Sequence, residues 1–476
     1  MENALRESES THGAAAAHEH GARPRSRLDS AVFVLLLTTM IFANLAYGAV
    51  ETWAFGFISI LAAAVALLWF VDAWREGEFR FHASPLQLSL AGLIAIGLVQ
   101  LLPLRSSAVT DGALSIPAAA TLSIDPHATR IAVVQLAIYF LFLAAAYVFI
   151  DDYRRLRKTV AVVIAFASTM AFFGILQRLV NPEGIYGWRP TPQAIPFASF
   201  INQHHFAAFM ELGIGLTLAL LIGQGVGKDK RPLLVIAVLL MGIALLLTGS
   251  RGGVLSLFGV LGFLFVTTLF RRRGESAGDE TPPEEQRKGR FRRHLALAGG
   301  GLALVFVLFG SVLLLGENDS LLRGVGVTNQ ADFSSGRTHF WRTAWEIFKD
   351  YPILGAGLDA FGTAFPQYDT WNGRLRVEQA HNDYLQILAD AGVLGFACAV
   401  SFIYLLFRRG FATIGASHDK FRRSAAHGAL AGCFGILLHS FFDFPLRTPS
   451  NAFFFLIFAV LATAAIEAPK HRHRRR

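Results

Sequence analysis

Long apolar runs recur along almost the whole chain, and shorter polar or basic stretches separate them. The runs are about 17 to 25 residues long, enough for a helix to cross a hydrocarbon core of roughly 30 Å. None shows the alternating pattern of a barrel strand, so the predicted spans are helices. The pattern predicts about twelve of them, near residues 30–50, 53–73, 85–103, 131–150, 160–180, 204–222, 232–249, 252–270, 295–316, 384–407, 424–441 and 451–467.

Composition and charge extend this picture. The chain is 53% hydrophobic with 42 phenylalanines, and its mean hydropathy is +0.46. With the N-terminus inside, 31 of the 43 Lys and Arg residues fall on the inner side, which predicts that both termini are cytoplasmic. The net charge of +9 then reflects topology and contact with the lipid bilayer, so nucleic acid is not an expected partner.

The pattern divides the chain into five parts. We expect a disordered cytoplasmic tail, nine helices, a large outer loop, three more helices and a basic cytoplasmic tail, over residues 1–29, 30–316, 317–383, 384–467 and 468–476. A loop of about 67 residues is long enough to suggest a function. Within it, residues 337–349 have the spacing of a Trp-rich amphipathic helix in the membrane interface. Tyr351-Pro352 should end that helix, and Gly355, Gly357 and Gly362 should form a flexible turn.

Two residues at the outer face are the strongest candidates for chemistry. Arg251 lies between two spans with almost no loop, where an arginine normally has an anionic partner. Snorkelling to lipid headgroups is the alternative, but the flanking glycines favour close approach of a ligand. His381 opens the tenth span, and the positive end of a helix favours the neutral imidazole that can act as a base. By helix geometry, neither Asp383 nor Asp390 should orient His381, and Asp390 should pair within the bundle.

Further polar residues should gather on the same face. Arg337 and Arg342 would add positive charge, and Asn202, His205, Asn382 and Arg447 are candidates for a substrate cavity. Asp443 and Arg447 are most simply an ion pair. Neighbouring His204 and His205 cannot share one helical face, so no metal site is predicted. The glycines lack the spacing of a dinucleotide fingerprint, so no cofactor is expected.

These motifs together resemble the bacterial O-antigen ligase and polymerase superfamily of membrane glycosyltransferases. Arg251 is followed after three residues by Leu255, and His381-Asn382 precedes a glycine pair, Gly392 and Gly395. The run from Gly336-Arg337 through Trp341, Pro352 and Gly355-Ala356-Gly357 to His381-Asn382 is similar to the core of the shared domain, and residues 200–207 are similar to its asparagine-rich helix entry. The resemblance covers about 200–450, on an all-α, GT-C-like polytopic bundle. Phe396 and Ala397 stand where ligases often carry small polar residues, so ligase and polymerase both stay open.

The resemblance implies a metal-independent, inverting transfer of a glycan from undecaprenyl pyrophosphate at the periplasmic face of the bacterial inner membrane. The acceptor would be lipid A-core in a ligase, or the glycan of another lipid-linked repeat unit in a polymerase. His381 would take the proton of the acceptor hydroxyl, and Arg251 and Arg337, with Arg342, would bind the departing pyrophosphate. A transporter or flippase is the more distant alternative, but it should carry its polar residues near mid-membrane, and most here lie at the outer face.

Overall fold

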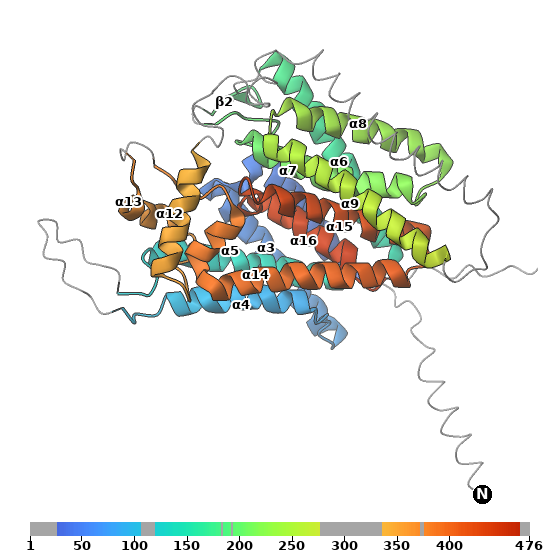
Figure 1. The fold of residues 1–476 in the computed structure, drawn as a ribbon. Coiled ribbons are helices and arrows are strands. Elements are labelled where there is room, and N and C mark those ends of the chain that lie inside the picture. Colours follow the sequence, from blue (N-terminus) through green and yellow to red (C-terminus); the bar gives the residue numbers. More distant parts are fainter. Residues whose placement is uncertain are drawn as a thin grey trace, which may run out of the picture.

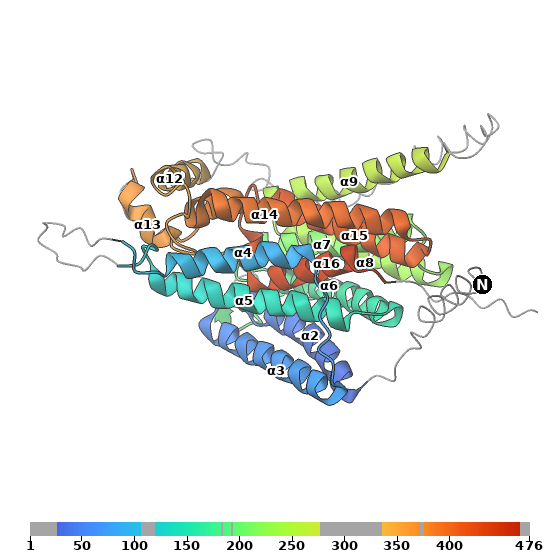
Figure 2. The same cartoon turned by 90° about the horizontal axis from the view of Figure 1, so that it is seen from below.

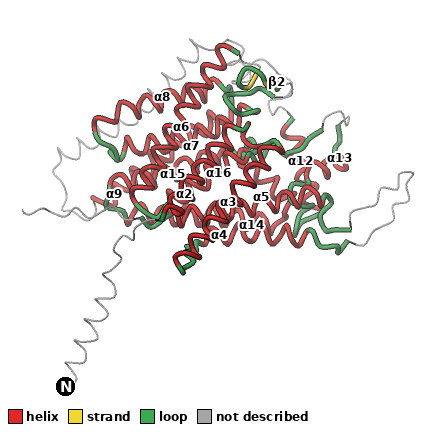
Figure 3. The backbone as a smooth tube through the Cα atoms, turned by 180° about the vertical axis from the view of Figure 1, so that it is seen from behind, coloured by secondary structure: helices red, strands yellow, loops and turns green. Residues whose placement is uncertain are grey.

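The computed structural model describes residues 26–105, 120–181, 184–191, 194–276, 336–371 and 376–466. Nearly all of this chain is helix (Figure 3). The strands of the described part form one small hairpin, in which β1 (Gly184–Ile185) pairs antiparallel with β2 (Arg189–Pro190). The prediction of an all-α polytopic membrane protein is therefore confirmed in its class. The expected span at 295–316, most of the two tails and the first part of the 317–383 loop lie outside the described residues.

The other eleven expected spans each coincide with a helix. Eight of the described helices are long and apolar enough to cross a membrane, and two shorter ones, α4 and α16, are also apolar. The helices are α2 (Arg27–Leu45), α3 (Thr52–Glu76), α4 (Pro85–Gln100), α5 (Pro126–Phe149), α6 (Tyr153–Val180), α7 (Gln203–Ile222), α8 (Arg231–Leu247), α9 (Arg251–Ser276), α12 (Arg337–Asp350), α13 (Phe361–Tyr368), α14 (Asp383–Ala416), α15 (Lys420–His439) and α16 (Pro449–Thr463). Short 3₁₀ turns occupy Tyr47–Ala49, Lys228–Lys230 and Pro445–Arg447.

The long helices run side by side, and α7, α15 and α16 lie in the middle of the bundle (Figures 1 and 2). The most extensive packing between two described helices joins α15 to α7. Gly428 and Gly432 are one helical turn apart on α15, and a Cβ on either would lie within about 3 Å of α7 backbone atoms. Small residues at this spacing let two helix backbones approach closely. The resulting van der Waals contacts hold the helices together in lipid, where the hydrophobic effect between helices is weak.

One end of the bundle is covered by α12 and α13. Figures 1 and 2 together show that α12 runs across the axes of the long helices. Its inner side buries Ala344 and Ile347 against a cluster with Phe361 and Phe365 of α13, while Trp345 is 48% exposed. The expected amphipathic helix therefore forms, and it ends at Asp350 as the Tyr351-Pro352 sequence predicts.

The following glycine-rich segment is held firmly against a break in α14, so the prediction of a flexible turn was wrong. Gly392 has φ +61° inside α14, and this interrupts the helical hydrogen bonds. The freed groups pair with the segment: Ala356 N–H donates to Ala389 O, and Val393 N–H donates to Pro352 O, both at 2.8 Å. Gly362 lies inside α13.

A buried glutamine on a distant helix completes this junction. The Gln100 amide nitrogen, at the end of α4, donates to Leu354 O and to Asp390 O, and its oxygen accepts from Leu358 N–H at 2.9 Å. Gln100 is fully buried. Its three hydrogen bonds join the end of α4 to the glycine-rich segment and to the Asp390 carbonyl beside the break in α14.

Candidate active site

His381 lies just before the first turn of α14, at the end of the bundle covered by α12. Its backbone has φ +52°, a left-handed conformation that is uncommon for residues other than glycine. Asn382 follows as the N-cap, and its side-chain oxygen accepts from Tyr384 N–H and Leu385 N–H at 3.0 Å. The left-handed residue and the N-cap together form the entry to α14.

The partner of His381 is Asp443, from the loop that joins α15 to α16. His381 Nδ1 lies 3.1 Å from Asp443 Oδ1, and the two residues are 62 positions apart. The His381 side chain is 30% exposed and that of Asp443 is 1% exposed. A carboxylate only accepts hydrogen bonds, so the neutral imidazole carries its proton on Nδ1 and has its lone pair on Nε2.

The charge state of Asp443 follows from its surroundings. Burial by itself would raise the pKa of this carboxyl, but the hydrogen bond with His381 and the nearby imidazoles of His204 and His205 hold the pKa well below its usual range. Asp443 is therefore a carboxylate at neutral pH. Sequence reasoning looked for this partner within the tenth span and missed it.

The helix α12 supplies three contacts around the same histidine. Arg337 places a guanidinium nitrogen 3.9 Å from Asp443 Oδ2. The Phe340 ring stacks on the His381 ring with centroids 5.8 Å apart, and Trp341 Nε1–H donates to His381 O at 3.3 Å. Asp443 thus joins the expected base to one of the expected arginines, His381 through one oxygen and Arg337 through the other.

Arg342 lies elsewhere on the same helix. It is exposed, and five residues along a helix rotate it by about 140° from Arg337. Among the described residues the structure does not bring Arg342 together with His381 or Asp443.

Arg251 begins α9 beside this cluster. The preceding Ser250 accepts from Gly253 N–H through its hydroxyl and lies 2.9 Å from His204 Nδ1. A Cβ on Gly252 would lie 3.0 Å from the His439 ring, whose helix ends just before Asp443.

The glycines around Arg251 serve packing within the protein. A Cβ on Gly253 would lie 2.8 Å from Ala207 of α7, so the space beside it is filled by protein. The expectation that Gly252 and Gly253 make room for a ligand was therefore wrong. Their effect is to bring the start of α9 close to α7 and to the end of α15.

The four candidate cavity residues all make contacts within the protein. Asn202 caps α7 by accepting from His204 N–H at 2.8 Å, and Asn382 caps α14 as described above. His205 is buried, and its Nδ1 lies 2.7 Å from Thr448 Oγ1. These contacts orient the helix ends around the cluster.

Arg447, the fourth, pairs with two carboxylates. One guanidinium nitrogen donates to Asp359 at 2.7 Å and the other to Asp390, which is fully buried in α14. The predicted ion pair between Arg447 and Asp443 was therefore wrong, because Arg447 points to the junction at the break in α14. The expectation that Asp390 pairs within the bundle was correct.

A second buried pair lies next to the cluster and was absent from the sequence reasoning. His439 Nδ1 is 2.7 Å from Glu211 Oε1, and both side chains are almost fully buried, at 1% and 0% exposure. Glu211 stands alone in an apolar span, which is the signal that could have singled it out. Within the described part of the chain, no group of three or more His, Cys, Asp or Glu side chains is arranged to hold a metal ion.

Comparison with known proteins bears on this geometry. Residues 236–400 match the sequence model of the O-antigen ligase family. This segment is therefore similar in sequence to O-antigen ligases. No curated protein matches the chain significantly.

The matched segment contains most of the candidate site. Arg251, Arg337 and His381 all lie within residues 236–400, whereas Asp443 lies beyond that segment. The match supports the resemblance to the O-antigen ligase and polymerase superfamily. Together with the eight long apolar helices among the described residues, it supports a multi-pass membrane protein.

Proposed function

We propose that the protein transfers a glycan from undecaprenyl pyrophosphate to an acceptor hydroxyl at the periplasmic face of the bacterial inner membrane. The single observation that carries this proposal is the bridge from His381 through Asp443 to Arg337 inside and beside the segment that is similar to O-antigen ligases. It places a proton acceptor and a fixed positive charge on one carboxylate, as transfer from an anionic donor requires.

In this mechanism His381 Nε2 removes the proton of the acceptor hydroxyl. The hydroxyl oxygen then attacks the anomeric carbon, and the bond from that carbon to the pyrophosphate oxygen breaks with its electron pair leaving on the pyrophosphate. A single displacement inverts the anomeric configuration. Asp443 stabilises the imidazolium that forms, as a buried carboxylate does beside a catalytic histidine.

Arg337 and Arg251 bind the pyrophosphate in this proposal. Charge on the leaving oxygen grows as the bond breaks, so hydrogen bonds from a guanidinium strengthen in the transition state. Arg337 is partly exposed, at 23%, and its distance of 3.9 Å from Asp443 leaves its donors available to a second anion. Arg342 is exposed on another side of α12, so we do not include it among the pyrophosphate-binding arginines. The reaction needs no metal, because the arginines supply the positive charge.

The acceptor decides between two activities of this superfamily. As a ligase the protein uses lipid A-core, and as a polymerase it extends another lipid-linked repeat unit. A transfer assay in liposomes tests both, with undecaprenyl-pyrophosphate oligosaccharide as the donor and with each acceptor supplied separately in EDTA. Transfer to lipid A-core establishes the ligase, and chain growth without lipid A establishes the polymerase.

The assay includes two histidine variants. His381→Ala should abolish transfer, and His127→Ala, an exposed histidine at the start of α5, should leave it intact. If folded wild-type protein transfers to neither acceptor, glycan transfer is ruled out and membrane transport becomes the leading function. Transfer that His381→Ala leaves unchanged would exclude this residue as the base.

A further inference from the structure

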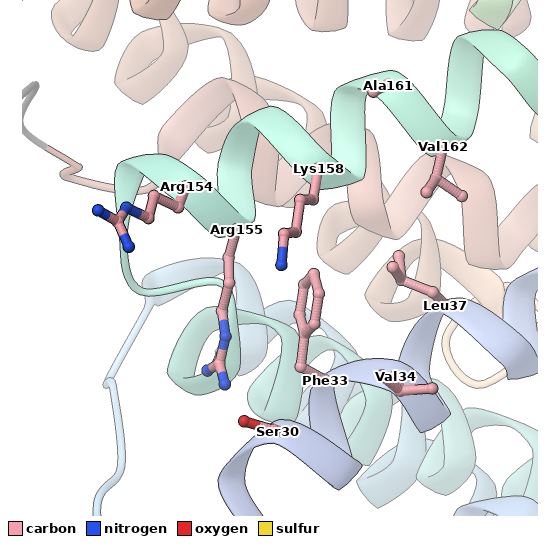
Figure 4. A pocket seen from close by; sticks show the side chains of 9 residues that line it. All are labelled: Ser30, Phe33, Val34, Leu37, Arg154, Arg155, Lys158, Ala161 and Val162. Carbon is pink, nitrogen blue, oxygen red and sulfur yellow. The ribbon is translucent and has the colours of Figure 1, made fainter. Parts of the chain in front are cut away.

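A groove of about 480 Å³ lies between α2 and α6, at the opposite end of the bundle from His381. It opens there because α2 packs on α3 and α5, whereas α6 packs on α7 and α8. Figure 4 shows the side chains that line it, which are Ser30, Phe33, Val34, Leu37, Arg154, Arg155, Lys158, Ala161 and Val162. These residues separate into a basic part and an apolar part.

The deepest basic residue of the groove is already neutralised. Arg155 is buried and forms an ion pair with Asp29, and its guanidinium lies 5.0 Å from the Phe33 ring centroid. Asp29 also pairs with Arg80, which reaches Asp72 at 2.8 Å. Asp151 also lies 3.5 Å from Arg155, so three carboxylates pair with the two guanidiniums. This network forms the bottom of the basic part.

Two further basic side chains line the groove outside this network. Arg154 and Lys158 are both exposed, and neither has a carboxylate partner among the described residues. Figure 4 shows the Lys158 ammonium pointing from α6 toward Phe33, with the Arg154 guanidinium at the outer edge of the same helix end. The N-terminal turn of α6 is capped by the Asp152 carboxylate, which accepts from Arg155 N–H, so the positive charge at this level comes from the Arg154 and Lys158 side chains.

The apolar part continues from the basic part along the two helices. Val34 is 59% exposed, and Leu37 and Val162 are partly buried in the same wall. A small anion would use only the charges and would leave this wall unoccupied. The combination favours an amphipathic ligand, with an anionic head beside Arg154 and Lys158 and a hydrocarbon chain along Val34, Leu37 and Val162.

We propose that this groove binds one anionic glycerophospholipid of the adjacent leaflet. The phosphate lies between Arg154 and Lys158, and one acyl chain fills the wall between α2 and α6. The Lys and Arg distribution of the chain assigns this end of the bundle to the cytoplasmic side, where anionic lipid attracts basic segments. The site is independent of glycan transfer and does not rest on the proposed function.

The test measures lipid retention by native mass spectrometry of the full-length protein released from nanodiscs of phosphatidylglycerol and phosphatidylcholine. The wild type should retain one phosphatidylglycerol with preference over phosphatidylcholine. Arg154→Gln with Lys158→Gln should reduce this retention about tenfold, since two basic contacts are lost. The matched control is Arg75→Gln with Arg157→Gln, because Arg75 is exposed and Arg157 lies over the Tyr153 and Phe421 rings, outside the groove.

A second variant tests the apolar part without changing any charge. Leu37→Trp should fill the groove and displace the acyl chain, so phosphatidylglycerol retention should again fall about tenfold while the basic residues stay in place. Equal retention of the two lipids by the wild type, or an equal loss in the Arg75→Gln, Arg157→Gln control, would overturn the proposal.

Competition identifies the source of the phosphate. Undecaprenyl phosphate and inorganic phosphate are each added against bound phosphatidylglycerol. Displacement by millimolar inorganic phosphate would show a small-anion site and overturn the lipid assignment. Preferential retention of undecaprenyl phosphate would replace the glycerophospholipid with the polyprenyl carrier, which also overturns the proposal as stated. Retention of phosphatidylglycerol against both supports it.

Discussion

His381 Nδ1 lies 3.1 Å from Oδ1 of Asp443, a residue 62 positions further along the chain. The pair joins the start of α14 to the loop after α15, and Asn382 Nδ2–H strengthens this junction by donating to Phe441 O at 3.1 Å. The imidazole is therefore fixed by one of its nitrogens, and the other is left for chemistry. This arrangement makes the role of Asp443 testable apart from that of His381.

Asp443→Asn should reduce transfer at least a hundredfold while donor KM changes little. The amide keeps the shape of the carboxylate, but it neither fixes the Nδ1 proton nor stabilises the imidazolium. Steady-state kinetics in liposomes separates kcat from KM. A rate within threefold of wild type would show that Asp443 only supports the loop.

The arginines of α12 should differ sharply in effect. Arg337→Gln should lower kcat/KM for the lipid-linked donor about a hundredfold or more, because a charge facing the pyrophosphate is lost. Arg342→Gln removes the same charge from the exposed side of the same helix and should stay within about twofold. Equal losses in the two variants would contradict the assignment of Arg337 and point to a general effect of charge at this face.

The break in α14 should tolerate no side chain at Gly392. The residue has φ +61°, and a Cβ there would lie 2.4 Å from the Ile353 carbonyl group. Gly392→Ala should therefore destabilise the protein by about 3 kcal/mol or more, through backbone strain and displacement of residues 352–357. Thermal unfolding in detergent measures the change.

Gly415→Ala is the matched control for this variant. It lies near the other end of α14 with no atom within 4 Å of its Cβ position. It should be neutral or stabilising by up to about 1 kcal/mol. Similar unfolding temperatures for the two alanine variants would show that Gly392 is not constrained as described.

Asp390 and Arg447 should behave as a coupled pair. Arg447→Gln leaves a fully buried carboxylate without its main partner, which costs about 3–5 kcal/mol. Adding Asp390→Asn removes the stranded charge and should recover most of this loss. A double-mutant cycle on thermal stability measures the coupling. Strictly additive losses would show that the two groups do not interact in the folded protein.

The pH dependence of stability gives a further check on Asp443. Its pKa is held well below the ordinary 3.8 in the folded protein, so its carboxylate contributes stability that is present above that ordinary value. The contribution is lost as pH falls through the lower folded-state pKa. A difference in unfolding temperature between wild type and Asp443→Asn should therefore be present from about pH 5 to 8 and shrink below about pH 4. A difference that is already lost well above pH 4 would contradict a depressed pKa.

Much of the site was predictable because its motifs mark helix ends. Arg251 follows a span that ends in Thr248-Gly249, and His381-Asn382 precedes an apolar run, so both were expected at one face. The amphipathic helix over Arg337 to Lys349 followed from its spacing and formed as α12. These features depend on neighbours within one or two helical turns, which a sequence displays directly.

The contacts across the bundle were not predictable in the same way. Arg447 was matched with its nearby neighbour Asp443, yet it pairs with Asp390 and Asp359, which lie 57 and 88 positions away. Which carboxylate an arginine meets depends on how α14 and the loop after α15 are rotated and packed. That rotation is set by contacts between distant segments and leaves no periodic signal.

The sequence by itself determined the helical class, the existence of most described spans and the end of the bundle that carries the candidate chemistry. Apolar length fixes the first two features, because a chain that crosses lipid must pair its backbone polar groups, and a helix pairs almost all of them internally. The third followed from the positions of Arg251 and His381 at the ends of predicted spans. Only the tertiary structure decided that Asp443 orients His381, that Arg342 lies apart and that Gly392 breaks α14 to receive residues 352–357. Those outcomes depend on side-chain packing between helices, where a difference of a few ångströms in position selects one partner over another.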